Sequence, residues 1–346
     1  MLSNLETDTT ETGRRLGHDL FRYRRSVQPE RLSPGIREGL AQAAARRIRP
    51  EPTDRFVKKW LQLRLSAHQR GRPFDDAVTP KLIEWIDVAV CPVLRVPLSH
   101  GELKDTDWSV DRLNNDGAYA VNNLAVMSRR ANEAKGSRTF DHVLALSRSP
   151  CPTDGLQPIE WLRLAALMLG PCFAARPHAA PTIPLVAPVP LLSVRLAMQQ
   201  VQHVFTTQAA TQAGKNRLIK HFRLASRDEQ SEARLRRLAE ALHQGLKGLE
   251  HPHDVWLLDG VMDSLQCWRQ TLGGPAWALA AAISSRLANS RTIAPSALAS
   301  WWMGSAGYVC GQVQPADAVR AGPAGPAGPA GRVRDTSLAS MRSAAA

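Results

Sequence analysis

The sequence contains few cysteines and no long hydrophobic stretch. Its five cysteines are odd in number and widely spaced, so they predict neither a disulfide framework nor a zinc knuckle. The most apolar segment, residues 161–175, is interrupted by Arg163 and by Gly170-Pro171, which makes it unsuitable for a bilayer-spanning helix. The first dozen residues are polar and acidic, unlike a secretory signal. We therefore expect a cytoplasmic protein with no membrane partner.

Positive charge is in clear excess. The chain has 44 Lys and Arg residues against 31 Asp and Glu residues, which gives a formal net charge of +13. A basic protein of this kind suits a partner rich in phosphate, and DNA is the partner that we predict. Acidic membranes also attract basic proteins, so the charge alone does not identify the partner.

Residues 108–136 are the one segment whose residue types and order suggest a specific chemistry. Polar and apolar residues alternate from 107 to 113, which predicts a strand that ends near Asp111. The run from Asn114 to Gly117, Asn-Asn-Asp-Gly, then favours a turn or an irregular loop.

A second strand and a helix are predicted directly after this loop. The apolar run 123–127 predicts the strand. Ser128 suits an N-cap, residues 129–135 suit a helix, and Gly136 suits its C-terminal stop. The segment is therefore predicted to form a strand, a loop, a strand and a helix.

This order resembles that of the ββα-metal (His-Me finger) nucleases, namely the HNH endonucleases and especially the recombination endonuclease VII-like branch of phages and mobile elements. The resemblance covers about residues 91–137. It implies a metal-dependent endonuclease that hydrolyses DNA phosphodiester bonds, with Mg²⁺ or Mn²⁺ as cofactor. By position, Asp111 and Asn132 match the metal ligands of the family, and Asn123 matches an asparagine that braces the loop.

The residue types fit that implied chemistry. Mg²⁺ takes oxygen ligands, often only one or two from the protein, and Asp111 and Asn132 offer a carboxylate and an amide oxygen. Arg129 and Lys135 lie three residues on either side of Asn132 and share its helix face. Together with Arg130 they are the predicted DNA-binding residues. The ordinary alternative is that Asp111 begins a turn and Asn132 is a solvated helix position.

The position of the family's general-base histidine holds Arg112. Arginine cannot be deprotonated near neutral pH, so Arg112 is predicted to hold the phosphate through two hydrogen bonds. It is grouped with Asp111, Asn123 and Asn132 as a candidate catalytic residue. His100 and His142 match no family motif and stay open as substitute bases.

The predicted fold is mainly α with a small α+β element. A ββα-metal nuclease hairpin is flanked by N-terminal helices and followed by an all-helical C-terminal domain. The predicted parts are a basic flexible arm (1–34), helices with the nuclease-like domain (35–150, core 91–137), a helix and Pro-rich linker (151–192), a helical domain (193–312) and a disordered tail (313–346).

Helical spacing and caps predict the individual helices. Thr79-Pro80 suits an N-cap and first turn, and Ser226 with Glu229 suits a capping box. Leu235, Leu238, Leu242 and Leu246 form an apolar stripe. The predicted helices cover residues 34–49, 53–69, 80–86, 161–169, 194–205, 228–246, 275–287 and 294–302.

Three functions follow as hypotheses. The leading one is an active DNA endonuclease. The second is an inactive protein with the nuclease fold that binds DNA or assists assembly. In this hypothesis the chain no longer cleaves DNA, because it lacks the general-base histidine of the family. In the third, the helical C-terminal domain is the main module and binds a protein partner or a second copy, while the hairpin holds DNA.

Overall fold

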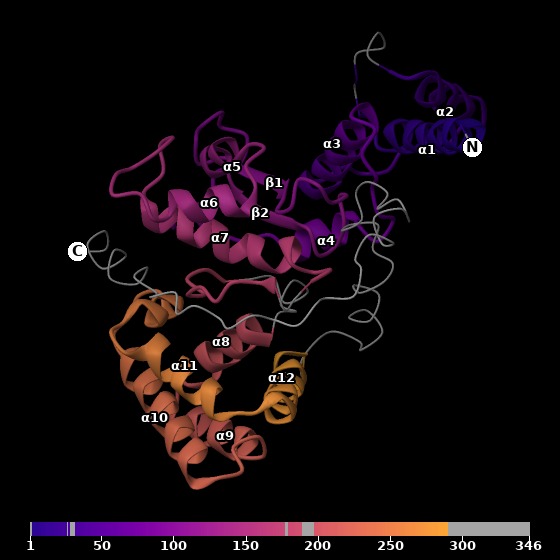
Figure 1. The fold of residues 1–346 in the computed structure, drawn as a ribbon. Helices are drawn as coiled ribbons and strands as arrows, with labels where there is room; N and C mark the ends of the chain where they lie inside the picture. Colours follow the sequence, from indigo (N-terminus) through magenta and orange to yellow (C-terminus); the bar gives the residue numbers. More distant parts are fainter. Residues whose placement is uncertain (1, 26, 28–31, 177–178, 189–196, 290–346) are drawn as a thin grey trace, which may run out of the picture.

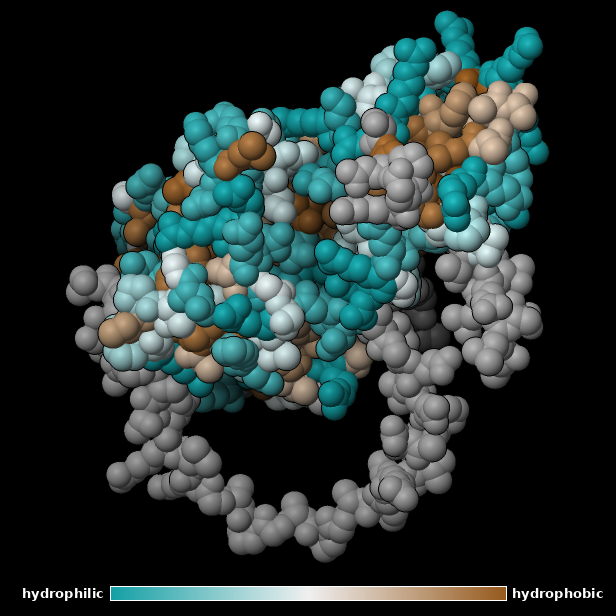
Figure 2. All heavy atoms as spheres, turned by 90° about the horizontal axis from the view of Figure 1, so that it is seen from above, coloured by the Kyte–Doolittle hydropathy of each residue, from teal (hydrophilic) through white to brown (hydrophobic). Residues whose placement is uncertain are grey.

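The computed structural model describes residues 2–25, 27, 32–176, 179–188 and 197–289 (Figure 1). In this part the protein is mainly α-helical and contains a two-stranded antiparallel sheet, which confirms the predicted mainly α class with a small β element. No helix in these residues has both the length and the apolar character needed to span a bilayer. Hydrophilic residues cover most of the face seen in Figure 2, with smaller hydrophobic areas between them.

Four helices precede the sheet: α1 (Leu2–Arg22), α2 (Pro34–Ala45), α3 (Arg55–Gln69) and α4 (Pro80–Trp85). The first two lie in close contact because glycines form the contact. A Cβ atom on Gly17 would come within 2.2 Å of the Ile36 carbonyl oxygen, and one on Gly39 within 2.1 Å of the Arg14 carbonyl oxygen. Thr79 caps α4 as predicted, accepting a hydrogen bond from the Leu82 amide.

The prediction of a flexible arm at residues 1–34 is wrong for residues 2–22, which form α1. Leu16 and Leu20 lie four residues apart on one helix face and are buried against Ile36 and Leu61. Most arginines of this segment, namely Arg15, Arg22, Arg24 and Arg25, are exposed, and Arg22 pairs with Glu51.

The predicted strand, loop, strand and helix are present. Strands β1 (Trp108–Arg112) and β2 (Leu124–Ser128) pair so that Trp108 lies opposite Ser128 and Arg112 lies opposite Leu124. Helix α5 (Arg129–Lys135) follows directly, and the Ser128 hydroxyl accepts a hydrogen bond from the Ala131 amide at 3.2 Å. Gly136 ends this helix with a positive φ of 49°.

Helices cover both faces of the sheet. Val110 and Val126 point towards α3 and α4, where they pack with Leu63 and Ile83. The other face, which includes Met127, packs against α5, α6 (Phe140–Leu146) and α7 (Pro158–Cys172). Side chains alternate between the two faces along each strand, so this arrangement decides where every candidate site residue of the hairpin points.

The C-terminal half is all-helical in its described residues. The stripe residues Leu235, Leu238 and Leu242 are buried as predicted, but Ser226 does not cap the helix. Asp228 does so, while the Ser226 hydroxyl accepts a hydrogen bond from the buried Trp268 indole at 2.9 Å. The elements are α8 (Ala197–Gln208), α9 (Gln212–Phe222), α10 (Glu229–Gly245), a 3₁₀ helix (Pro252–Leu257), α11 (Val261–Thr271) and α12 (Gly274–Asn289). The predicted helix at 294–302 and the tail at 313–346 lie outside the described residues.

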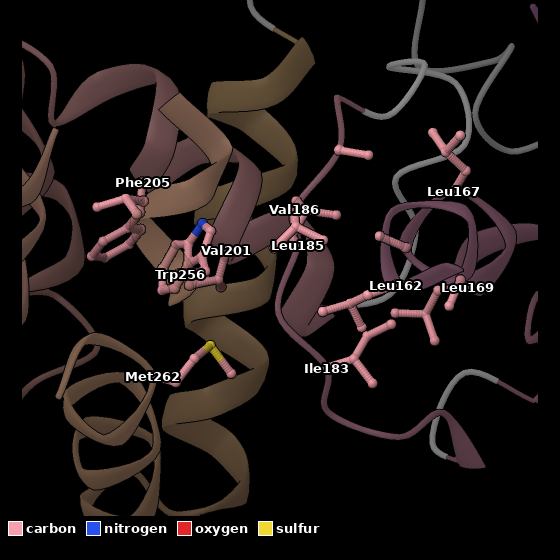
Figure 3. Close-up of a cluster of buried hydrophobic side chains, with 14 of the residues drawn as sticks. Leu162, Leu167, Leu169, Ile183, Leu185, Val186, Val201, Phe205, Trp256 and Met262 are labelled. Atoms are coloured by element: carbon pink, nitrogen blue, oxygen red, sulfur yellow. The ribbon is translucent and has the colours of Figure 1, made fainter. Parts of the chain in front are cut away.

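The predicted linker is part of the core where it is described. Ile183, Leu185 and Val186 are buried between α7 on one side and α8 on the other (Figure 3). The Gln202 side chain holds this segment, because its oxygen accepts from the Leu185 amide at 2.7 Å and its nitrogen donates to the Ile183 carbonyl at 3.1 Å. Its proline content predicted a stiff extended connector, and proline suits an extended segment whose few amides are bonded by a side chain.

Candidate functional site

Strand β1 and helix α5 bring Asp111 and Asn132 to one strand–helix contact. Ser109 and Asp111 are two residues apart on β1, so both point to the face that carries α5. The Asn132 amide donates a hydrogen bond to the Ser109 hydroxyl at 2.8 Å, and the Lys135 ammonium donates to Asp111 Oδ2 at 2.8 Å. The two residues predicted to bind the metal therefore lie in neighbouring contacts between the same two elements.

Lys135 contributes a buried cation to this site. Its side chain has 0% exposure, and its ammonium is held between Asp111 and the Asn115 side-chain oxygen, which lies 2.9 Å away. The structure therefore places it beneath the surface, paired with a carboxylate, and not where DNA would contact it directly. Sequence reasoning put Lys135 on the face of Asn132 but missed the pair with Asp111, which depends on how closely α5 approaches the end of β1.

Arg112 points to the opposite face of the sheet. Its guanidinium donates to the carbonyl oxygens of Asn115 at 3.0 Å and Gly117 at 2.8 Å, and it lies 4.9 Å from the centre of the Tyr119 ring. The side chain is buried, and Nε has no hydrogen-bond partner among the described residues. In this arrangement Arg112 holds the loop between the two strands.

Asn123 holds the same loop from its other end. Its side-chain oxygen accepts from the Asn114 amide at 2.7 Å, and its nitrogen donates to the carbonyls of Asn114 at 2.8 Å and Ala118 at 2.9 Å. The residue is fully buried. These bonds satisfy loop backbone groups that have no strand partner, which fixes where the first strand ends beside Asp111.

The predicted DNA-binding arginines lie at the start of α5. Arg129 pairs with Asp105 at 2.8 Å and lies 3.6 Å from Glu133, and both carboxylates are exposed. Arg130 is exposed and donates a hydrogen bond to the Gly155 carbonyl. Both arginines are accessible to a large partner.

The two candidate bases are not joined to this contact by any hydrogen bond within the described part of the chain. His100 is bonded to Arg55 at 3.1 Å, and its ring lies 5.4 Å from that of Trp108. His142 is exposed on α6. The structure brings Asp111, Asn132, Lys135 and Ser109 together and leaves both histidines outside that group.

Buried groups around the site have perturbed pKa values. Burial raises the pKa of the Cys172 thiol to about 12, although the nearby Lys135 cation opposes this. A thiol with such a pKa is neutral at pH 7. Burial also lowers the pKa of Lys59, whose ammonium lies 5.0 Å from the Trp108 ring centre, and the Asp107 carboxylate opposes this shift.

The donor atoms fit a hard divalent cation. The described residues contain no group of three or more His, Cys, Asp or Glu side chains suited to a metal ion. Mg²⁺, however, needs only one or two protein oxygens and keeps much of its water. Asp111 has a second carboxylate oxygen and Asn132 has its amide oxygen in addition to the atoms already bonded. The Lys135 ammonium, which is bonded to Asp111, weakens the attraction of that carboxylate for a metal cation.

Comparison of this chain with known protein families, curated proteins and solved structures gives no match. The resemblance to ββα-metal nucleases thus rests on residues 91–137 of the sequence. The order of elements and the two strand–helix contacts are consistent with it.

Proposed function

We propose that this chain is a metal-dependent DNA endonuclease whose single divalent cation is held by Asp111 and Asn132. The observation that carries the proposal is that β1 and α5 bring these two oxygen donors to one strand–helix contact. The net charge of +13 suits a polyanionic substrate. A bound Mg²⁺ or Mn²⁺ would polarise the phosphodiester and stabilise charge on the departing oxygen.

The other residues of the hairpin position this pair. Lys135 orients the Asp111 carboxylate through its hydrogen bond. Arg112 and Asn123 fix the loop, so the end of β1 has one geometry relative to α5. Arg129 and Arg130 at the start of α5 contact the DNA backbone.

A non-catalytic DNA-binding protein is the second candidate, and one observation favours it. Arg112, at the position of the general base, is bonded to the loop's own carbonyls and cannot accept a proton. A protein of this kind keeps the hairpin as a scaffold, with the Lys135 ammonium on Asp111 in place of a metal ion.

Nicking of supercoiled plasmid by the full chain separates the two candidates. An endonuclease nicks with Mg²⁺ or Mn²⁺ and stops with EDTA. Asn132→Asp should keep the activity, because an oxygen ligand remains, while Asn132→Ala should lose most of it. Asp141→Ala, which removes an exposed carboxylate on α6, is the matched control and should nick like the wild type.

Each alternative result has a distinct meaning. DNA binding without nicking in either metal supports the non-catalytic candidate. Equal activity of Asn132→Asp and Asn132→Ala contradicts the metal assignment. Absence of DNA binding contradicts both candidates. Circular dichroism of each variant shows whether a lost activity reflects unfolding.

A further inference from the structure

Helices α9 and α10 lie at the end of the molecule farthest from α1 and α2 (Figure 1). A basic groove is formed by residues of these two helices and of the turn after α9. The groove has a volume of about 660 Å³. It is lined by Asn216, Ile219, Lys220, Arg223, Leu224 and Arg236.

The groove carries more positive charge than its carboxylates neutralise. Residues 212–247 contain nine Lys and Arg against four Asp and Glu. Glu232 is shared by Arg223 at 2.9 Å and Arg236 at 2.6 Å, so one carboxylate faces two guanidinium groups. The hydrogen bond from Arg236 holds the pKa of Glu232 below its usual range, and Glu232 stays ionised.

Lys220 adds a cation that has no carboxylate partner among the described residues and is exposed. It projects from α9 because the opposite side of this helix, with Leu218 and Phe222, is buried in the core. Asn216, Lys220 and Arg223 therefore form a polar stripe along the groove. The stripe spans roughly 10 Å at 1.5 Å per residue, which corresponds to about three base-pair steps along the axis of a DNA duplex.

We propose that the α9–α10 groove binds the phosphate backbone of duplex DNA, as a contact surface separate from the β1–α5 site. DNA fits the groove better than an acidic protein does, because protein interfaces are depleted of lysine and charge at their centre. The groove instead presents Lys220, which has no carboxylate partner among the described residues, and two arginines that share Glu232, with Leu224 as an exposed apolar side chain. Contacts of this kind recognise the positions of phosphate groups and do not distinguish base sequences.

Fluorescence anisotropy tests the proposal with the full chain, a fluorescein-labelled 20-base-pair duplex of mixed sequence, and EDTA to prevent cleavage. Lys220→Ala and Lys220→Glu are compared with Lys247→Ala and Lys247→Glu. Lys247 is exposed just after α10 and does not line the groove, and among the described residues its ammonium bonds to Gln244 and to no carboxylate. The matched pairs have equal net charge.

Both Lys220 variants should bind the duplex more weakly than their Lys247 counterparts. Lys220→Ala should lower the slope of log affinity against log salt by about 1. The wild type should therefore lose about threefold more affinity than Lys220→Ala between 50 and 200 mM salt. The charge reversal should have the larger effect.

Equal affinities and equal salt slopes for the Lys220 and Lys247 variants would overturn the proposal. So would tighter binding of polyglutamate or of a single-stranded RNA of equal length than of the duplex. Asp141→Ala, which removes an exposed carboxylate on α6, should bind DNA like the wild type in the same assay. If the Lys220 and Lys247 variants bind DNA equally while the wild type nicks plasmid, only the groove proposal is contradicted. If the Lys220 variants bind more weakly and the wild type does not nick, only the endonuclease proposal is contradicted.

Discussion

The ββα hairpin and the C-terminal helices use polar side chains in opposite ways. In the hairpin Arg112, Asn123 and Lys135 are buried and bonded to loop backbone or to Asp111. In α9 and α10 most charged side chains lie outside, and a stripe of leucines fills the core. Two five-residue strands leave many backbone groups unpaired, so side chains must bond them, whereas helices satisfy their own backbone. Polar substitutions should therefore be costly in the hairpin and mild in the helices.

The largest effect should come from breaking the Asp111–Lys135 pair. Asp111→Ala leaves a fully buried ammonium with only Asn115, and should lower the free energy of unfolding by about 3 kcal/mol. Urea denaturation measures the change. Arg236→Ala is the matched variant in the helices, because Arg236 is exposed and pairs with Glu232 one helical turn away, and it should cost less than about 1 kcal/mol. Similar losses in both variants would remove the contrast between the two regions.

The buried segment 183–187, which lies between α7 and α8, should be as sensitive to a polar substitution as the hairpin is. Gln202→Leu leaves the Leu185 amide and the Ile183 carbonyl buried without partners, at a cost of about 3 kcal/mol. Gln244→Leu, an exposed glutamine on α10, should change stability by less than about 0.5 kcal/mol. Thermal or urea unfolding compares them, and a Gln202 effect as small as that of Gln244 would mean that the 183–187 segment is held by apolar contacts alone.

The C-terminal helical region should lose stability in mild acid through His253, which lies in the 3₁₀ helix Pro252–Leu257. Burial lowers the pKa of His253 to about 4, with help from the neighbouring His203 and Arg95. Between pH 6.5 and pH 4 the unfolded chain binds a proton at this histidine that the folded chain does not. Stability should therefore fall by about 2 kcal/mol as the pH drops from 6.5 to 5. His253→Gln should flatten this part of the stability curve, and His142→Gln, an exposed histidine, should not; equal curves would contradict the assignment.

The smallest effect should come from Arg112→Lys. A lysine at this position would keep one hydrogen bond to the loop carbonyls and lose the second bond and the planar contact with Tyr119. The free energy of unfolding should therefore fall by about 1 kcal/mol. Arg129→Lys, which changes an exposed pair, should be neutral. A large loss of nicking with unchanged stability would instead support a phosphate contact by Arg112.

Local signals in the sequence predicted much of the hairpin. The Asn114 to Gly117 cluster marks the loop, and Ser128 and Gly136 mark the two ends of α5. Turns and caps depend on a few adjacent residues, so a single sequence carries them. Asp111 and Asn132 were paired as metal ligands by the resemblance to the ββα-metal nucleases, and not by these local signals.

Contacts between distant residues were not predictable in this way. Arg112 bonds to carbonyls of its own loop and packs against the Tyr119 ring, and Lys135 meets Asp111 across 24 positions of sequence. The burial of Ile183 likewise depends on Gln202, whose side chain replaces a missing strand partner. In α1 the basic residues were visible in the sequence, but the close approach to α2 was not.

The glycine contact between α1 and α2 has a consequence for genetic experiments. Any side chain at Gly17 or Gly39 would collide with backbone of the facing helix, so neither position tolerates substitution. A saturation scan scored by plasmid nicking would place both glycines beside Asp111 among the most sensitive positions. Their sensitivity would report helix packing, and scoring protein abundance in parallel would distinguish these glycines from residues that act on DNA.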